Sequence, residues 1–216
     1  MRNSSVIALA VAAMASVIIA SNFLVQMPVN GQVGAVNLAD ILTWGAFTYP
    51  FAFLVTDVTN RLVGPVIARR VVFAGFAIAV ATPLLLEQVA NLPPSTTRIV
   101  LASGTAFLVA QLLDIAVFQR LRGLAWWRAP LVSSVVGSAI DTALFFTLAF
   151  TALIAFQVDG FAVATSPLLG VENAPEMPRW ISWAIADFGV KMLVAMFALI
   201  PFRLVIAYAL ASPRTT

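Results

Sequence analysis

The chain of 216 residues contains no cysteine and no histidine. Without cysteine there is no disulfide and no thiolate nucleophile, and without either residue the usual nitrogen and sulfur ligands of zinc are missing. The lack of histidine also removes the side chain that most often acts as a general base near neutral pH. We therefore expect no metal site, no cofactor and no enzymatic activity.

Charged residues are also scarce, because they make up 10% of the chain while hydrophobic residues make up 62%. A soluble domain has about 25% charged and about 45–50% apolar residues. Together with a mean hydropathy of +1.01, these proportions predict an all-α integral membrane protein with one domain over residues 1–216. The net charge of +3 fits basic membrane loops. The sequence contains no stripe rich in lysine and arginine, so nucleic acid is not expected as a partner.

Long apolar runs of about the 20 residues that a membrane-spanning helix needs recur along the whole chain. The six predicted spans are 6–25, 37–64, 71–86, 98–118, 130–156 and 180–209. Pro50 lies inside the second span, where it removes a helix hydrogen bond, so we expect this helix to be broken or kinked there. Residues 157–179, with three prolines, are predicted to form a long loop.

The arginines of the loops are distributed unevenly between the two sides that six spans define. One side would hold Arg98 and Arg179. The other would hold nine arginines: Arg2, Arg61, Arg69, Arg70, Arg120, Arg122, Arg128, Arg203 and Arg214. Because positive residues favour the cytoplasmic side, we predict that both termini are cytoplasmic.

Ionisable residues inside predicted spans are costly in lipid and are candidates for a functional site. Asp57 with Arg61, and Asp187 with Lys191, are spaced four residues apart and so share a helix face. Either couple could be a structural ion pair or part of a site. Asp114 and Asp141 have no such neighbour; each could meet Arg69 or Lys191 from another helix, or be protonated.

A set of short segments in the chain forms a recognisable pattern. The segments are SNFLVQ at 21–26, TWGAFTYPF at 43–51, FLVTD at 53–57 with Arg61, ARR at 68–70, QLLD at 111–114, VF at 117–118, RLR at 120–122, WW at 126–127, AP at 129–130, SAIDT at 138–142, and Asp187 with Lys191. In these segments the chain resembles the queuosine precursor transporter family, also called the YhhQ or VUT family. It departs from that family at Gly137-Ser138, where an Asn after the Gly is expected, and in loop 157–179.

The resemblance implies a bacterial inner-membrane importer of 7-cyano- and 7-aminomethyl-7-deazaguanine, which are salvaged for the tRNA nucleoside queuosine. A single carboxylate can accept both N1–H and the exocyclic amine of such a base. We place Asp141 or Asp187 on this guanine face, near Lys191, with Trp44 stacking on the base. The remaining assignments are Asn22, Gln26 and Gln111 as polar contacts, and Asp57, Arg61 and Asp114 as a cytoplasmic gate or coupling network.

Three other interpretations stay open at this point. The chain could be the substrate-binding subunit of a multi-component vitamin or base importer, which would need a partner ATPase because no G-x-x-x-x-G-K-[ST] loop is present. It could be an intramembrane enzyme, although no G-x-S-x-G motif stands out. It could also be a structural helix bundle whose internal charges only pair with one another. The coupling ion, the preferred base and the formation of a homo-oligomer are left open.

Overall fold

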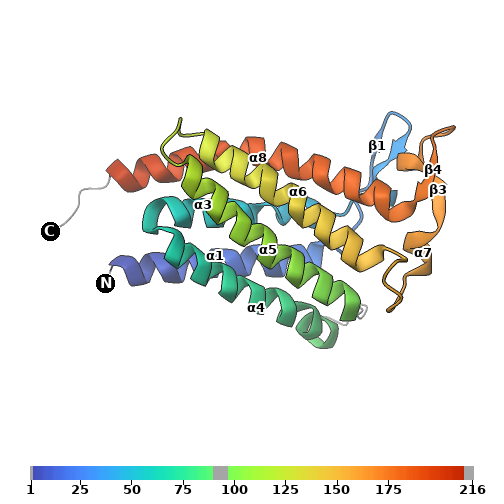
Figure 1. Cartoon of the computed structure of the whole chain (residues 1–216), viewed down its shortest axis with the longest axis horizontal. Helices are drawn as coiled ribbons and strands as arrows, with labels where there is room; N and C mark the ends of the chain where they lie inside the picture. The colour runs from blue at the N-terminus through green and yellow to red at the C-terminus, as the bar shows by residue number, and fades with distance from the viewer. Residues whose placement is uncertain (1, 90–96, 212–216) are drawn as a thin grey trace.

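The computed structural model describes residues 2–89 and 97–211, which form a bundle of helices with two short β-hairpins (Figure 1). The predicted all-α class is confirmed by the helices that make up most of the bundle. The elements in chain order are α1 (Arg2–Leu24), β1 (Gln32–Val33), β2 (Val36–Asn37), η1 (Leu38–Asp40), α2 (Trp44–Thr48), α3 (Phe51–Val63), α4 (Pro65–Val89), α5 (Thr97–Leu121), α6 (Arg128–Phe150), α7 (Gly160–Val163), β3 (Thr165–Pro167), η2 (Leu168–Gly170), β4 (Glu176–Pro178) and α8 (Arg179–Ala211).

Five helices are long and apolar enough to cross a membrane within the described part of the chain. They are α1, α4, α5, α6 and α8, and they correspond to five of the six predicted spans. A helix rises about 1.5 Å per residue, so about 20 residues cross a hydrocarbon layer of about 30 Å. The protein is therefore a multi-pass membrane protein.

Among the six predicted spans, 37–64 differs most from the structure. Its first residues belong to β2 and η1, and the helical part is divided into α2 and α3 on either side of Tyr49 and Pro50. Both residues keep right-handed helical dihedral angles. α2 begins near the hairpins and α3 ends near the start of α1 (Figure 1), so together they run along the bundle. A sixth crossing of the membrane by α2 and α3 stays a prediction.

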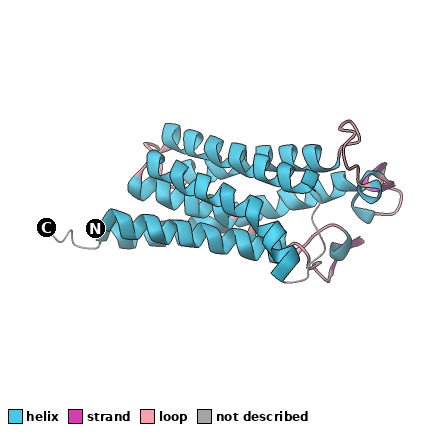
Figure 2. Ribbon diagram, turned by 90° about the horizontal axis from the view of Figure 1, so that it is seen from below, coloured by secondary structure: helices cyan, strands magenta, loops and turns pink. Residues whose placement is uncertain are grey.

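The two ends of the bundle differ in structure. The β1–β2 and β3–β4 hairpins and α7 lie at one end, here called the hairpin end; the start of α1 and the end of α8 lie at the other, here called the terminal end (Figures 1 and 2). The predicted loop 157–179 thus contains α7, β3, η2 and β4. The indole N–H of Trp183 donates to the carbonyl of Asp40 at 3.0 Å and so joins α8 to the first hairpin region.

α6 ends at Phe150 rather than at the predicted residue 156, and Arg98 explains where it stops. This buried arginine donates to the carbonyls of Leu148, Thr151, Ile154 and Phe156. A cation placed on the last carbonyls of a helix satisfies groups that have no partner within the helix. Arg98 was expected only at the outer start of the fourth span, and in the structure it also stabilises the end of α6.

Close packing of α2 against α1 brings Tyr49, in the second predicted span, to the centre of the bundle. Gly45 makes this approach feasible, because a Cβ atom there would lie 2.9 Å from backbone atoms of Val25. One turn later, Tyr49 points to Asp141 on α6 and donates a hydrogen bond to it at 3.2 Å. The local sequence around Gly45 thus positions a residue of the candidate site.

Candidate functional site

A large cavity of about 1030 Å³ extends from the middle of the bundle toward the hairpin end. Its walls come from the end of α1, the segment 39–46, α5, α6 and the start of α8, and residues of α7 and the second hairpin region add to the rim. The polar side chains in its lining are Ser21, Asn22, Gln26, Asp40, Thr43, Tyr49, Ser103, Asp141, Ser166, Arg179, Ser182, Asp187 and Lys191. A cavity of this size with a few polar groups is the usual form of a small-molecule site.

An ionic network, here called the cavity floor, closes the inner end of this cavity. It consists of Tyr49, Asp141, Thr142, Asp187 and Lys191. The Lys191 ammonium donates to Asp141 Oδ2 at 2.7 Å, to Asp187 Oδ2 at 2.5 Å and to Thr142 Oγ1 at 3.0 Å. Since an ammonium has three donors, Lys191 is fully satisfied within the protein.

Further contacts hold the two carboxylates of the cavity floor in place. Tyr49 Oη donates to Asp141 Oδ1, and Thr142 Oγ1 donates to Asp187 Oδ2 at 2.8 Å. The Lys191 ammonium also lies 5.5 Å from the centre of the Tyr49 ring. With all three ionisable groups charged, two carboxylates and one ammonium leave the floor with a net charge of −1. The floor therefore favours a ligand that offers hydrogen-bond donors or positive charge.

The predicted pairing of Asp187 with Lys191 along α8 is confirmed. Asp141 comes to the same ammonium from α6, which confirms one of the two partners considered for it. Asn22 and Gln26 also line the cavity, near the end of α1. The structure thus gathers five of the predicted substrate-binding residues around one space: Asn22, Gln26, Asp141, Asp187 and Lys191.

Two predicted substrate-binding residues lie elsewhere. Trp44 is absent from the described lining of the cavity, is 49% exposed and packs against Phe47. Gln111 is fully buried, and its Oε1 accepts a hydrogen bond from Thr56 at 2.5 Å. Helical spacing gives no information on which neighbouring helix a residue faces, so the sequence could not separate these two from the residues of the cavity.

The predicted gate residues lie between the cavity floor and the terminal end. Asp57 accepts hydrogen bonds from Ser133 and Ser134 of α6, each at 3.2 Å. The ion pair that was one of two alternatives for Asp57 and Arg61 does not form, because Arg61 donates instead to the carbonyl of Arg122 at 3.1 Å. A long arginine side chain near a helix end extends toward the water and is not held by a buried carboxylate one turn away.

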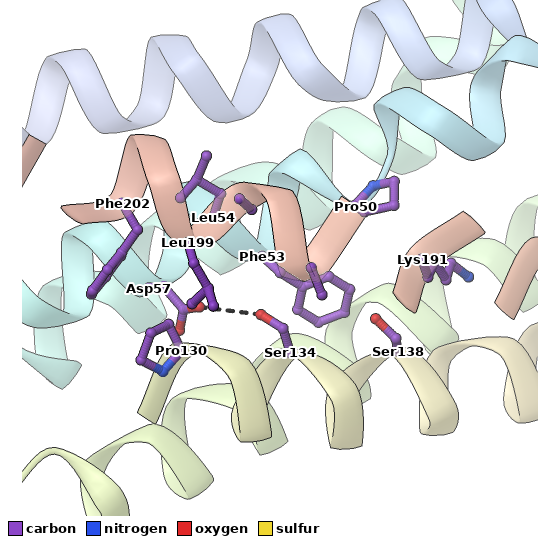
Figure 3. A pocket seen from close by; sticks show the side chains of 12 residues that line it. Pro50, Phe53, Leu54, Asp57, Pro130, Ser134, Ser138, Lys191, Leu199 and Phe202 are labelled. Carbon is purple, nitrogen blue, oxygen red and sulfur yellow. Dashed lines mark hydrogen bonds between the residues drawn. The ribbon is translucent and has the colours of Figure 1, made fainter. Parts of the chain in front are cut away.

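A small crevice of about 10 Å³ lies directly below the cavity floor. Figure 3 shows that Ser134 donates a hydrogen bond to Asp57 near one end of this crevice. Lys191 lies at the other end, with Ser138 between them. Phe202 and Leu54 line it toward the terminal end. They belong to a cluster with Phe118 and Ala129 that fills the bundle interior there. The large cavity is therefore separated from the terminal end by packed side chains.

Several aromatic residues of the cavity were not assigned to the site from the sequence. Phe145, Phe146 and Phe150 form a cluster on α6, and Trp183 of α8 contacts Phe150 edge to face. Phe145 is four residues after Asp141, which is the spacing of neighbours on one helix face. This spacing could have indicated an aromatic wall above the acidic group.

A multi-pass helix bundle with a buried ionic floor, a cavity toward one end and packed side chains toward the other has the general organisation of a membrane transporter. Comparison with known proteins agrees with this class. Residues 43–206 match the family model described as "Putative vitamin uptake transporter", and the chain belongs to this family.

Individual relatives carry a more specific name. The chain is 33% identical over 198 residues to the queuosine precursor transporter of Escherichia coli K12, covering 86% of this chain and 79% of that protein. It is 37% identical over 153 residues to a probable queuosine precursor transporter of Haemophilus influenzae, covering 62% and 65%. A protein of the same name from Bacillus subtilis is 29% identical over 129 residues, covering 50% and 56%. No solved structure matches the chain.

Proposed function

We propose that this protein is a bacterial inner-membrane importer of 7-cyano- and 7-aminomethyl-7-deazaguanine for the salvage of queuosine precursors. The observation that carries this proposal is the cavity floor, where carboxylates and a lysine from α6 and α8 meet at the base of a large cavity. Support also comes from relatives that are named queuosine precursor transporters.

Asp187 is the carboxylate best placed to accept N1–H and the exocyclic amine of the base. Its side chain is 16% exposed, whereas that of Asp141 is 4% exposed. Lys191 and Thr142 both bind Asp187 through Oδ2, so Oδ1 has no bond from a described residue. Asp141 uses one oxygen for Lys191 and the other for Tyr49. We therefore assign the guanine face to Asp187 and the support of Lys191 to Asp141.

The flat ring of the base would stack on an aromatic side chain of the cavity. Phe145, Phe146 and Phe150 stand on the same helix as Asp141, and base stacking is worth about 1–3 kcal/mol. These residues take the role that the sequence assigned to Trp44. Asn22 and Gln26 lie across the cavity on the α1 side, where they would serve as polar contacts.

The proposed orientation has both termini in the cytoplasm, so that the hairpin end faces outward. Arg61, Arg69 and Arg120 support it, because they stand near the helix ends at the terminal end, where the positive-inside tendency places the cytoplasm. In this orientation the large cavity opens outward and the cluster around Phe118 and Phe202 closes the inner side. Asp57, Arg61 and Asp114 lie on that inner side, in the position of a gate or coupling network.

Transport by the chain alone can be tested in liposomes that contain only this purified protein. We expect radiolabelled 7-cyano-7-deazaguanine to enter by exchange against unlabelled base in the lumen and to be recovered chemically unchanged. Exchange that appears only with a partner ATPase would favour the alternative of an importer subunit. Conversion of the base would indicate an enzyme.

The pathway can be tested in a bacterial strain that cannot make the precursors and depends on their uptake. Deleting this gene should abolish queuosine in tRNA, and the wild-type gene should restore it. Asp187→Asn should restore little, while Glu172→Gln, at an exposed loop position, should restore it fully. Normal queuosine in the deletion strain would contradict the proposal.

A further inference from the structure

Two buried carboxylates below the cavity floor, Asp57 of α3 and Asp114 of α5, form what is here called the acid pair. Asp57 is 2% exposed and Asp114 is fully buried. Contacts on either side bring these parts of α3 and α5 together, because Thr56 donates to Gln111 and Asn60 donates to the carbonyl of Ile115. Asp57 lines the crevice that lies between the cavity floor and the packed cluster at the terminal end.

Among the side chains that the structure describes, no cation forms an ion pair with either member of the acid pair. On the same helix as Asp57, Arg61 donates to the carbonyl of Arg122. Lys191 of α8 shares the crevice with Asp57, but its ammonium is committed to Asp141, Asp187 and Thr142.

Six other arginines on α4, α5, α6 and α8 also lie away from the acid pair. Arg69 and Arg70 of α4 and Arg120 of α5 are exposed. Arg98 of α5 binds carbonyls after α6 at the hairpin end. Arg128 of α6 and Arg203 of α8 lie over tryptophan rings.

Hydrogen bonds distinguish the two members of the acid pair. Asp57 has two serine hydroxyls as donors, which can stabilise one negative charge. Both carboxylate oxygens of Asp114 are buried without a hydrogen-bond partner among the described residues. Two adjacent anions without a cation, in a site away from water, would cost several kcal/mol each. The pair is therefore expected to hold at least one proton, shared between its members.

Hydroxyl groups lead from the acid pair to the cavity floor. Ser134, Ser138 and Thr142 are spaced four residues apart along one face of α6. Ser134 binds Asp57, Thr142 binds Lys191, and Ser138 lines the crevice between them (Figure 3). The crevice has about the volume that one water molecule requires. Ser138 is thus the polar side chain of the crevice that lies between the acid pair and the floor.

We propose that Asp57 and Asp114 are a proton-binding site that couples import of the base to the inward movement of a proton, an inference that rests on the proposed transport function. The protonated pair allows α3, α5 and α6 to pack closely at the terminal end. Loss of the proton to the cytoplasm places two anions side by side, and their repulsion favours separation of these helices. The proton thus binds from the outer cavity and leaves to the cytoplasm, and the empty protein returns to the outward-open state before it binds the next proton from outside.

The test uses purified protein in liposomes and the 7-cyano base, whose charge does not change between about pH 6 and 7.5. One proton per base and a gradient of one pH unit, acid outside, should support accumulation of up to about tenfold. Addition of the base outside should also acidify the lumen, as read by a trapped pH-sensitive dye. This second measurement needs no variant protein.

Variants then locate the coupling. Asp57→Asn and Asp114→Asn should exchange labelled for unlabelled base but no longer accumulate it, and should not acidify the lumen. Glu172→Gln, an exposed carboxylate, should behave as the wild type. Accumulation driven by a sodium gradient, or undiminished proton-driven accumulation in both variants, would overturn the proposal. Wild-type exchange that ignores the pH gradient would overturn it too, whereas absence of any exchange would overturn the transport function itself.

Discussion

The cavity floor and the acid pair each hold two aspartates inside the bundle, but only the floor has a cation. At the floor, Lys191 lies between Asp141 and Asp187 and donates to both. In the acid pair, Asp57 has only serine donors, and Asp114 has no hydrogen-bond partner among the residues that the structure describes. The floor can stay ionised and present an oxygen to a ligand, while the pair must bind a proton to be stable. The same residue type therefore serves two purposes, decided by its neighbours.

Replacing Lys191, the cation of the cavity floor, should have the largest effect on the stability of the protein. Lys191→Met leaves the carboxylates of Asp141 and Asp187 without a cation, and breaking a buried ion pair in this way costs about 3–5 kcal/mol. We expect a large fall in the melting temperature of the detergent-purified protein, measured by scanning fluorimetry.

A double variant provides the control for Lys191. Adding Asp141→Asn to Lys191→Met removes one of the two uncompensated charges and should recover part of the lost stability. A single variant as stable as the wild type would show that the floor does not depend on its lysine.

The second largest effect concerns substrate binding at Asp187. In Asp187→Asn, Asp141 still pairs with Lys191, so the fold should persist, but one guanine donor loses its acceptor. Leaving a hydrogen-bonding group of the ligand unpaired costs about 1–3 kcal/mol. The affinity for the 7-cyano base should therefore fall about 10- to 100-fold, measured by calorimetry. Unchanged affinity would show that a residue other than Asp187 binds the guanine face.

The acid pair should respond in the opposite direction from the floor. Asp114→Asn removes a carboxyl group that has no cation, so we expect the melting temperature to stay the same or rise. Asp141→Asn, the matched change at the floor, removes a partner of Lys191 and should lower it. Equal destabilisation by the two changes would contradict the proposed difference between the acid pair and the cavity floor.

A smaller loss of stability is expected from a change in packing between the two regions. A Cβ atom at Gly137 would lie 2.6 Å from the ring of Phe53, which lines the crevice next to Asp57. Gly137→Ala should force this ring to shift, at a cost of about 1–3 kcal/mol. Thermal unfolding should detect the loss, and Gly160→Ala, where a Cβ meets nothing within 4 Å, is the control.

The smallest effect is expected at Trp44, outside both regions. Because its side chain is half exposed and does not line the cavity, Trp44→Ala should change the exchange rate of the base by less than about twofold. Phe146→Ala should reduce binding by about tenfold or more, since stacking is worth about 1–3 kcal/mol. Strong loss of exchange in the Trp44 variant alone would return the stacking role to Trp44.

Helical spacing indicated which contacts within one helix were possible, but the neighbouring helices decided which of them formed. Asp187 and Lys191 were expected to pair because four residues separate them, and they do. The same spacing failed for Asp57 and Arg61, since serines of α6 and the carbonyl of Arg122 offered other partners. The sequence placed Gln111 in the substrate site, whereas the packing of α5 against α3 turned it toward Thr56.

The sequence by itself determined that this protein is a helical membrane protein, where most of its spans lie, and which family it resembles. These properties follow from apolar runs and short motifs, which are local along the chain. Only the tertiary structure decided that Asp141 shares a lysine with Asp187 while Asp57 and Asp114 are buried without one. The physical reason is that the balance of a buried charge depends on groups from other helices, which no spacing along a single helix specifies.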